Sequence, residues 1–323
     1  MRGFDIRRPA VRGEGRSAAF RRGRLWAYAA WRWLKVLCGD RSPMVASLKV
    51  TSRCDLRCRH CPWTAESSPD LSLEEWKTRI QALARQGVLQ LILEGGEPTL
   101  RPDLAQMIEF GRAEGLLVTV ATNAGRPLTG LRPDRFLVSI DGLEEVHDRL
   151  RGKGAFGRMS GNISGMQAPV VALVSLCREN RSQLRAILEA FHGRVQGFWF
   201  SFTYDYPGRE PLALDSEERR RAALELLELS AHHPILNTRS FLRGVGTRRG
   251  CRPWLMTTVS SDGSQKDGCL VSAAGGQEPD CARCDLPCQR ELSDFADPLF
   301  LADSLRAALR KSWLIPAKPG YKN

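Results

Sequence analysis

The sequence predicts an α/β fold, a partial parallel (β/α)6 barrel followed by a small cysteine-rich module at the carboxyl end. Six short apolar segments alternate with longer stretches of helical spacing. These apolar segments are continuous, which is typical of parallel strands that are buried on both faces. The alternation stops near residue 235, where glycine, proline and cysteine become frequent. The chain is therefore expected to hold one large α/β unit and one small appended unit.

The six expected strands are rich in leucine, β-branched or aromatic residues. They are residues 47–52, 89–94, 117–122, 136–140, 170–176 and 197–202. Four stretches have the spacing of amphipathic helices, and Ser72 is expected to cap the first. They are residues 73–86, 102–114, 182–191 and 216–232. In folds of this type the functional residues lie at the carboxyl ends of the strands.

Composition suggests four segments along the chain. They are a basic, tryptophan-rich extension (1–44), the barrel (45–235), the auxiliary module (236–300) and a carboxyl-terminal helix and tail (301–323). Most of the net charge of +12 belongs to the start of the chain, because residues 1–35 hold ten basic and two acidic residues. The basic charge is thus a local property of the extension, and we do not expect a nucleic-acid partner.

No apolar run approaches the ~18 residues of a membrane span, and the amino terminus lacks a secretory signal. We therefore expect a cytoplasmic protein, whose ten cysteines are reduced thiols or metal ligands rather than disulfides. Residues 20–38 mix arginines with tryptophans. This composition leaves open a peripheral membrane contact, and equally a helix packed across the open barrel.

Cys54, Cys58 and Cys61 follow the first expected strand with C-x3-C-x2-C spacing. Three thiolates so close together can bind three irons of one [4Fe–4S] cluster and leave the fourth iron open for a chelating small molecule. A zinc site would need a fourth ligand nearby, and the five histidines show no H-x3–5-H pattern. The spacing therefore favours an iron–sulfur cluster.

This motif, C-x3-C-x-(aromatic or His)-C after the first strand of a βα barrel, resembles that of radical S-adenosylmethionine (SAM) enzymes. Glu94-Gly95-Gly96-Glu97-Pro98, Thr122-Asn123 and Ser139-Ile140-Asp141-Gly142 resemble further family segments at the ends of the next three strands. The resemblance implies that the reduced cluster cleaves SAM to methionine and a 5′-deoxyadenosyl radical, which abstracts hydrogen from the substrate. It assigns to the SAM site His60, Gly95, Gly96, Glu97, Pro98, Asn123, Ser139 and Asp141.

Five further cysteines, Cys251, Cys269, Cys281, Cys284 and Cys288, lie near the carboxyl end, and Asp262-Gly263 between the first two predicts a hairpin. The pattern resembles the shortened auxiliary (SPASM/twitch-like) modules of radical SAM enzymes, which bind a second [4Fe–4S] cluster. The first four are the favoured ligands, with Cys288 as the alternate. A zinc ribbon is the competing interpretation.

Cys177 and Tyr204 lie at the ends of the fifth and sixth strands, where a hydrogen-atom donor to a product radical would sit. A buried thiol and a packing aromatic are the simpler explanation of both. A flavodoxin or ferredoxin is the expected electron donor.

The substrate is expected to be a membrane lipid or isoprenoid, another small molecule, or a ribosomal peptide. The basic start of the chain favours the lipid, and the auxiliary module the peptide. The non-enzymatic alternative is a zinc-stabilised nucleic-acid-binding protein.

Overall fold

The computed structural model describes residues 18–65, 68–164, 166, 168–247, 251–275 and 278–293. Its centre is an eight-stranded sheet with the order β6-β5-β4-β3-β2-β1-β7-β8. All neighbouring pairs are parallel except β7 and β8. The strands are β1 (Val45–Thr51), β2 (Gln90–Gly95), β3 (Leu117–Thr122), β4 (Arg135–Ser139), β5 (Val170–Leu176), β6 (Gly197–Phe202), β7 (Met256–Val259) and β8 (Gln265–Asp267).

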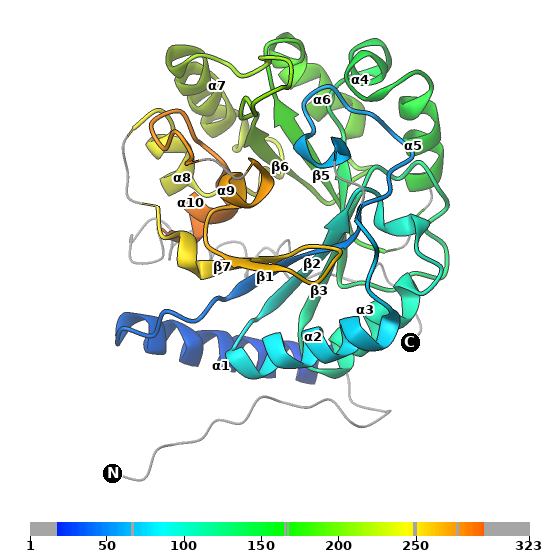
Figure 1. Ribbon diagram of the computed structural model, residues 1–323. Helices are drawn as coiled ribbons and strands as arrows, with labels where there is room; N and C mark the ends of the chain where they lie inside the picture. The colour runs from blue at the N-terminus through cyan, green and yellow to red at the C-terminus, as the bar shows by residue number, and fades with distance from the viewer. Residues whose placement is uncertain are drawn as a thin grey trace.

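The sheet curves into a partial barrel, and helices cover its outer face (Figure 1). The helices are α1 (Ala18–Leu37), α2 (Leu73–Gln86), α3 (Leu104–Ala113), α4 (Glu144–Arg151), α5 (Ala155–Ile163), α6 (Leu184–Phe191), α7 (Ser216–Leu229), α8 (Arg239–Gly244), α9 (Leu270–Gly275) and α10 (Pro287–Ser293). Short 3-10 turns are η1 (Pro62–Ala65), η2 (Pro98–Leu100), η3 (Arg181–Gln183) and η4 (Pro253–Leu255). The expected partial barrel with six parallel strands is confirmed.

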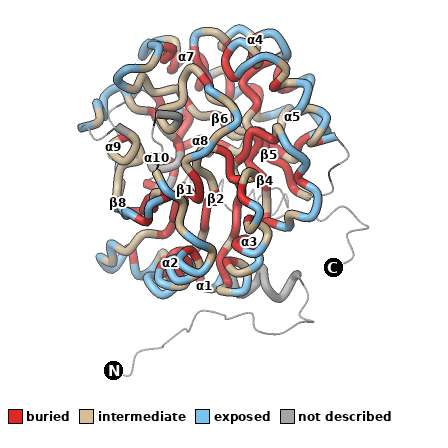
Figure 2. The backbone as a smooth tube through the Cα atoms, turned by 45° about the vertical axis from the view of Figure 1, so that its right-hand side comes forward, coloured by how far each residue is buried: buried red, intermediate tan, exposed pale blue. Residues whose placement is uncertain are grey.

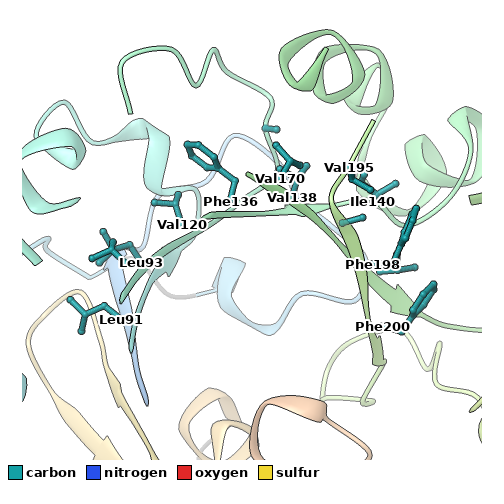
Figure 3. Packing of buried hydrophobic residues seen from close by; sticks show 14 of the residues in the cluster. Leu91, Leu93, Val120, Phe136, Val138, Ile140, Val170, Val195, Phe198 and Phe200 are labelled. Atoms are coloured by element: carbon teal, nitrogen blue, oxygen red, sulfur yellow. The ribbon is translucent and has the colours of Figure 1, made fainter. Parts of the chain in front are cut away.

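The main core lies between the sheet and the outer helices. Alternate strand residues such as Leu91, Leu93 and Phe136 point from the convex side of the sheet toward the helices (Figure 3). Strands β1 to β7 are mostly buried, whereas β8 at the edge of the sheet is exposed (Figure 2). The other set of alternate residues faces the barrel interior and includes polar side chains. The alternation therefore separates an apolar outer core from a partly polar lumen.

Local sequence explains where the first helix after the cysteine motif begins and ends. Ser72 and Glu75 form a reciprocal capping box, and Gly87 ends the helix in the left-handed conformation. The predicted cap at Ser72 is therefore confirmed. Two helices that the sequence did not indicate, α4 and α5, lie between β4 and β5.

Helix α1 covers the amino ends of β1, β2 and β7, because its Val36 and Trp33 pack with Met44, Leu89 and Leu255. The alternative in which residues 20–38 form a helix across the open side of the barrel is therefore wrong. No described helix is long and apolar enough to cross a membrane.

The strand β7 extends the barrel sheet, although it follows the expected boundary at residue 235. It pairs in parallel with β1 and then turns through Ser260–Ser264 into antiparallel β8. The hairpin predicted at Asp262-Gly263 is confirmed. The following helices lie beside the open side of the barrel, α9 against β7 and η1 and α10 against β6 (Figure 1).

Buried carboxylates join this carboxyl-terminal segment to the barrel. Glu291 accepts hydrogen bonds from Trp199 Nε1 at 3.1 Å and from Thr238 N at 2.9 Å. Asp285 lies between Arg219 of α7, at 2.9 Å, and Arg290 of α10.

The predicted division of the chain into four segments stays a prediction. Its last segment, 301–323, lies outside the described residues.

Candidate metal and cofactor site

The three cysteines of the first motif lie in the loop that follows β1, here called the cysteine loop (residues 52–61). Asp70 fixes the start of this loop, because it accepts hydrogen bonds from Thr51 Oγ1 at 2.8 Å and from Ser52 N at 3.2 Å. A turn brings Cys58 and Cys61 together, since Cys61 N donates to Cys58 O at 3.2 Å. The loop is therefore a folded element and carries its thiols in defined positions.

The thiols of this loop have surroundings that suit ligands of a positively charged cluster. Burial raises the pKa of Cys54 to about 12 and also raises that of Cys58, so these thiols hold their protons unless a cation binds them. Leu56 N lies 3.5 Å from Cys54 Sγ, and Arg151 Nη1 lies 3.9 Å from Cys58 Sγ. Donors aimed at ligand sulfurs are a usual feature of iron–sulfur sites.

Among the described residues, no three histidine, cysteine or acidic side chains converge tightly enough to hold one metal ion. Ligands of a four-iron cluster stand farther apart than ligands of a single ion, because each thiolate binds a different iron. The spacing and surroundings of Cys54, Cys58 and Cys61 thus fit a [4Fe–4S] cluster, and their role as its ligands remains a prediction.

Gly95 and Gly96 let the end of β2 approach the cysteine loop closely. A Cβ on Gly95 would lie 2.3 Å from Thr51 O, and one on Gly96 would lie 2.1 Å from Arg53 O. Gly96 N and Glu97 N both donate to this backbone, to Thr51 O and Arg53 O at 2.8 Å. The close approach made by these glycines is therefore to the protein's own chain next to Cys54.

Glu97 joins the ends of β2 and β3. Its side chain accepts hydrogen bonds from Thr99 N at 3.0 Å, from Thr122 Oγ1 at 2.7 Å and from Asn123 N at 2.8 Å. Burial raises its pKa, while these donors act in the opposite direction. Pro98, also buried, begins η2 directly after it. The assignment of Glu97 and Pro98 to the SAM site stays a prediction, and the observed bonds give the Glu97 carboxylate a positioning role.

Asn123 connects the end of β3 with the cysteine loop, because its Nδ2 donates to Asp55 Oδ1 at 2.8 Å. The next residue, Ala124, has a positive φ of 52°, and no other described residue apart from glycines has a positive φ. An alanine in this left-handed region costs energy that the surrounding bonds must offset. No motif in the sequence pointed to Asp55 or to the backbone of Ala124.

Asp141, at the end of β4, is fully buried and does not face open space. Its Oδ2 accepts from Arg151 Nε at 2.6 Å, and its Oδ1 accepts from Ser175 N at 2.9 Å. His60 Nε2 lies 3.7 Å from Oδ2. Sequence reasoning missed Arg151, which connects this carboxylate with Cys58. No sequence signal pointed to it, because the sequence did not indicate α4, the helix that Arg151 ends.

The remaining predicted residues of the barrel occupy three different surroundings. Ser139 ends β4 on the lumen side. Cys177 packs with Val146, Leu150 and Leu212, and burial raises its pKa to about 11. Tyr204 Oη accepts from Asp280 N at 3.0 Å, beside Cys281 of the carboxyl-terminal group. These contacts describe a packing thiol and a tyrosine at the barrel–module contact, and their hydrogen-donor roles stay predictions.

The carboxyl-terminal cysteines form a second group. Burial raises the pKa of Cys251 to about 11, and the nearby Cys269 and Cys281 also raise it. Burial likewise raises the pKa of Cys284 to about 11, with Cys269 and Cys251 adding to the shift. The four favoured cysteines are thus close enough for their charges to interact, although the sequence spreads them over residues 251–284. The side chain of Cys288 lies outside the described residues.

Charged side chains lie on the lumen side of β1 and β2. Lys49 Nζ is 2.9 Å from Glu94 Oε1, and the Lys49 side chain is only 7% exposed. The same ammonium lies 4.0 Å from the ring centre of Trp63, just beyond the cysteine loop. Lys49, Trp63 and Gly96 help to line a small pocket that is open to solvent. The lumen near the cysteine loop is therefore polar.

Comparisons with known proteins agree with this geometry. Residues 48–163 match the model of the Radical SAM superfamily. The Fe-coproporphyrin III synthase of Methanosarcina barkeri is 36% identical over 128 residues, 36% of this chain and 32% of that protein. The PqqA peptide cyclase of Bradyrhizobium diazoefficiens is 31% identical over 162 residues, 46% of this chain and 43% of that protein. The chain thus spans less than half the length of these relatives.

Among solved structures, Streptococcus suis SuiB bound to the precursor peptide SuiA superposes with a TM-score of 0.63 at 15% identity. The match covers 89% of this chain and 72% of SuiB, and it shows a shared fold. The resemblance to radical SAM proteins, first seen in the cysteine motif and the strand-end segments, is confirmed over residues 48–163.

Proposed function

We propose that this chain, which carries a Radical SAM superfamily domain at residues 48–163, is an iron–sulfur enzyme that cleaves SAM reductively and modifies a peptide. The observation that carries the proposal is the joining of the cysteine loop to the ends of β2 and β3 and to the end of helix α4. Arg53, Asp55 and Cys58 of that loop contact Gly96, Asn123 and Arg151.

Cys54, Cys58 and Cys61 would hold a [4Fe–4S] cluster with one open iron, and SAM would bind there beside Gly95, Gly96 and Asn123. When bound, the cluster supplies one electron to the SAM sulfonium, and the carbon–sulfur bond breaks to give methionine and a 5′-deoxyadenosyl radical. Glu97 and Asp141 hold the ends of β2, β3, β4 and β5 in register around this point. The protein's part is to orient SAM and to keep water from the radical.

The polar lumen favours a peptide over an isoprenoid substrate. An isoprenoid chain would have to lie against the charged pair Lys49–Glu94, and burying these charges against hydrocarbon is costly. A peptide offers amide and side-chain groups that can hydrogen-bond with them. The likeness to a PqqA peptide cyclase supports the same substrate class.

Cys251, Cys269, Cys281 and Cys284 would hold the second [4Fe–4S] cluster. Their mutual proximity and the hydrogen bond from Asp280 N to Tyr204 Oη, which joins their loop to the barrel, support this assignment. A flavodoxin or ferredoxin would supply the electrons.

Anaerobic reconstitution tests the proposal. We expect about eight irons per chain, four for each cubane, and formation of 5′-deoxyadenosine when dithionite and SAM are added. Cys58→Ser should remove about half of the iron and all 5′-deoxyadenosine. Cys251→Ser should remove the other half of the iron, yet leave SAM cleavage measurable. Zinc in place of iron, or an iron-loaded protein that does not cleave SAM, would overturn the proposal.

The substrate class needs its own experiment. The chain would be co-expressed with each short reading frame next to its gene, and the peptides would be examined by mass spectrometry for loss of hydrogen or for a new cross-link. Coproporphyrin and isoprenoid alcohols would be tested in parallel. Conversion of either small molecule, with every peptide unchanged, would contradict the peptide assignment.

A further inference from the structure

Arg151 lies between a thiol of the cysteine loop and a buried carboxylate. Its Nη1 is 3.9 Å from Cys58 Sγ, and its Nε donates to Asp141 Oδ2 at 2.6 Å. The Arg151 side chain is 10% exposed, and that of Asp141 is 0% exposed. A guanidinium carries five N–H groups in a rigid fork, so one arginine can serve both partners.

Both ends of this arrangement are fixed by further bonds. Asp141 accepts from Ser175 N at the end of β5, and its backbone N donates to His147 Nδ1 at 3.2 Å. The cysteine loop is tied to α4 through Arg59 N, which donates to Leu150 O at 3.0 Å. The contact between Arg151 and Cys58 therefore depends on the docking of α4 and not on a free side chain.

The local charges give this contact an electrostatic effect on the sulfur. The guanidinium of Arg151 forms a buried ion pair with the carboxylate of Asp141, with 2.6 Å between Nε and Oδ2. The Cys58 sulfur therefore has the cation of Arg151 next to it, and the anion of Asp141 lies on the other side of that cation.

We infer that Arg151 is a positioning residue that sets the reduction potential of the proposed [4Fe–4S] cluster through the Cys58 sulfur, with Asp141 as its opposing charge. The inference rests on the proposed function. Hydrogen bonds and positive charge at a ligand sulfur stabilise the added electron of the reduced cluster, whereas negative charge destabilises it. Arg151 therefore raises the potential, and Asp141 holds the arginine in place and partly offsets its charge.

The test is a redox titration of the primary cluster, followed by electron paramagnetic resonance in the anaerobically reconstituted full chain. A Cys251→Ser background removes the proposed auxiliary signal. In Arg151→Met we expect the ratio of reduced to oxidised cluster at a fixed potential to fall about tenfold, ~59 mV for a one-electron couple. Arg151→Lys keeps the charge and should shift the ratio less. Asp141→Asn removes the anion and should shift the ratio in the opposite direction.

Arg158→Met is the matched control, because Arg158 is an exposed arginine on the neighbouring helix α5, and its loss changes the net charge equally. Opposite shifts in Arg151→Met and Asp141→Asn cannot come from a general loss of stability. If Arg151→Met fails to hold iron, the directions of the potential shifts in Arg151→Lys and Asp141→Asn test the inference.

Potential shifts of the same sign in Arg151→Met and Asp141→Asn would overturn the inference. So would an unchanged potential in Arg151→Met together with a loss of SAM binding. Either result would leave the proposed function standing. A wild-type chain without iron would overturn both.

Discussion

At the residue scale, the site depends on close backbone approach and on buried polar bonds more than on open polar surfaces. Gly96 shows this most directly, because the space that a Cβ would need is filled by Arg53 O at 2.1 Å. Glu97 and Asp141 show the same in another way, since both carboxylates are buried and hydrogen-bonded to neighbouring strand ends. These residues hold the strand ends that contact the cysteine loop.

Gly96→Ala should destabilise the chain by about 1–3 kcal/mol, because the backbone of β2 or of the cysteine loop must move to admit the methyl group. The measurement is urea unfolding of the purified protein. The matched control is Gly157→Ala in α5, where an added Cβ meets no described atom within 4 Å. That substitution should stabilise the helix by roughly 0.5–1 kcal/mol. Equal effects of the two substitutions would contradict the steric explanation.

At the scale of elements, α4 and the segment around α10 are the pieces that connect distant parts of the chain. The last turn of α4 brings Leu150 and Arg151 to the cysteine loop. Asp285, just before α10, lies between Arg219 and Arg290 and follows Cys284 directly. Each element therefore couples the packing of the barrel to the position of a cysteine.

Asp285→Asn should cost about 3–5 kcal/mol, because it leaves the buried guanidinium of Arg219 and the partly buried one of Arg290 without their carboxylate. It should also lower the iron content assigned to the carboxyl-terminal cysteines, since Cys284 is the preceding residue. Urea unfolding and iron analysis measure the two effects. Glu217→Gln serves as the control, because Glu217 and Arg221 form an exposed pair at 4.0 Å. Its effect should stay within about 0.5 kcal/mol. A stable Asp285→Asn variant with full iron would disprove this role.

At the scale of the whole molecule, one continuous sheet passes from the barrel into the cysteine-rich segment. β1 lies between β2 and β7, and all seven of its residues are buried. Without β7, the hydrogen-bonding edge of this buried strand would be exposed, and such edges promote aggregation. The barrel is thus expected to need the start of the following segment for its own stability.

A chain that ends at residue 250 should therefore aggregate or unfold without cooperativity, as measured by size-exclusion chromatography and urea unfolding. A chain that ends at residue 268 keeps β7 and β8 but lacks Cys269, Cys281 and Cys284, so it separates the role of the sheet from that of the cysteines. It should remain the more soluble of the two. Cooperative unfolding of the shorter chain at wild-type stability would show that residues 45–235 fold independently.

The sequence by itself determined the features that depend on neighbouring residues. Strand and helix periods predicted the six parallel strands and the helices α2, α3, α6 and α7. The spacing of Cys54, Cys58 and Cys61 pointed to the superfamily that residues 48–163 match. Period and spacing are local properties, so they can be read without knowledge of the fold.

Only the tertiary structure decided which distant groups meet. Arg151 reaches a cysteine 93 residues away, and β7 pairs with β1 across most of the chain. Glu97 and Asp141 look like open acidic ligands in the sequence, yet strand order buries both carboxylates among donors from neighbouring strand ends. The partner of a buried charge depends on the strand order and on helix docking, and neither is encoded in a short segment.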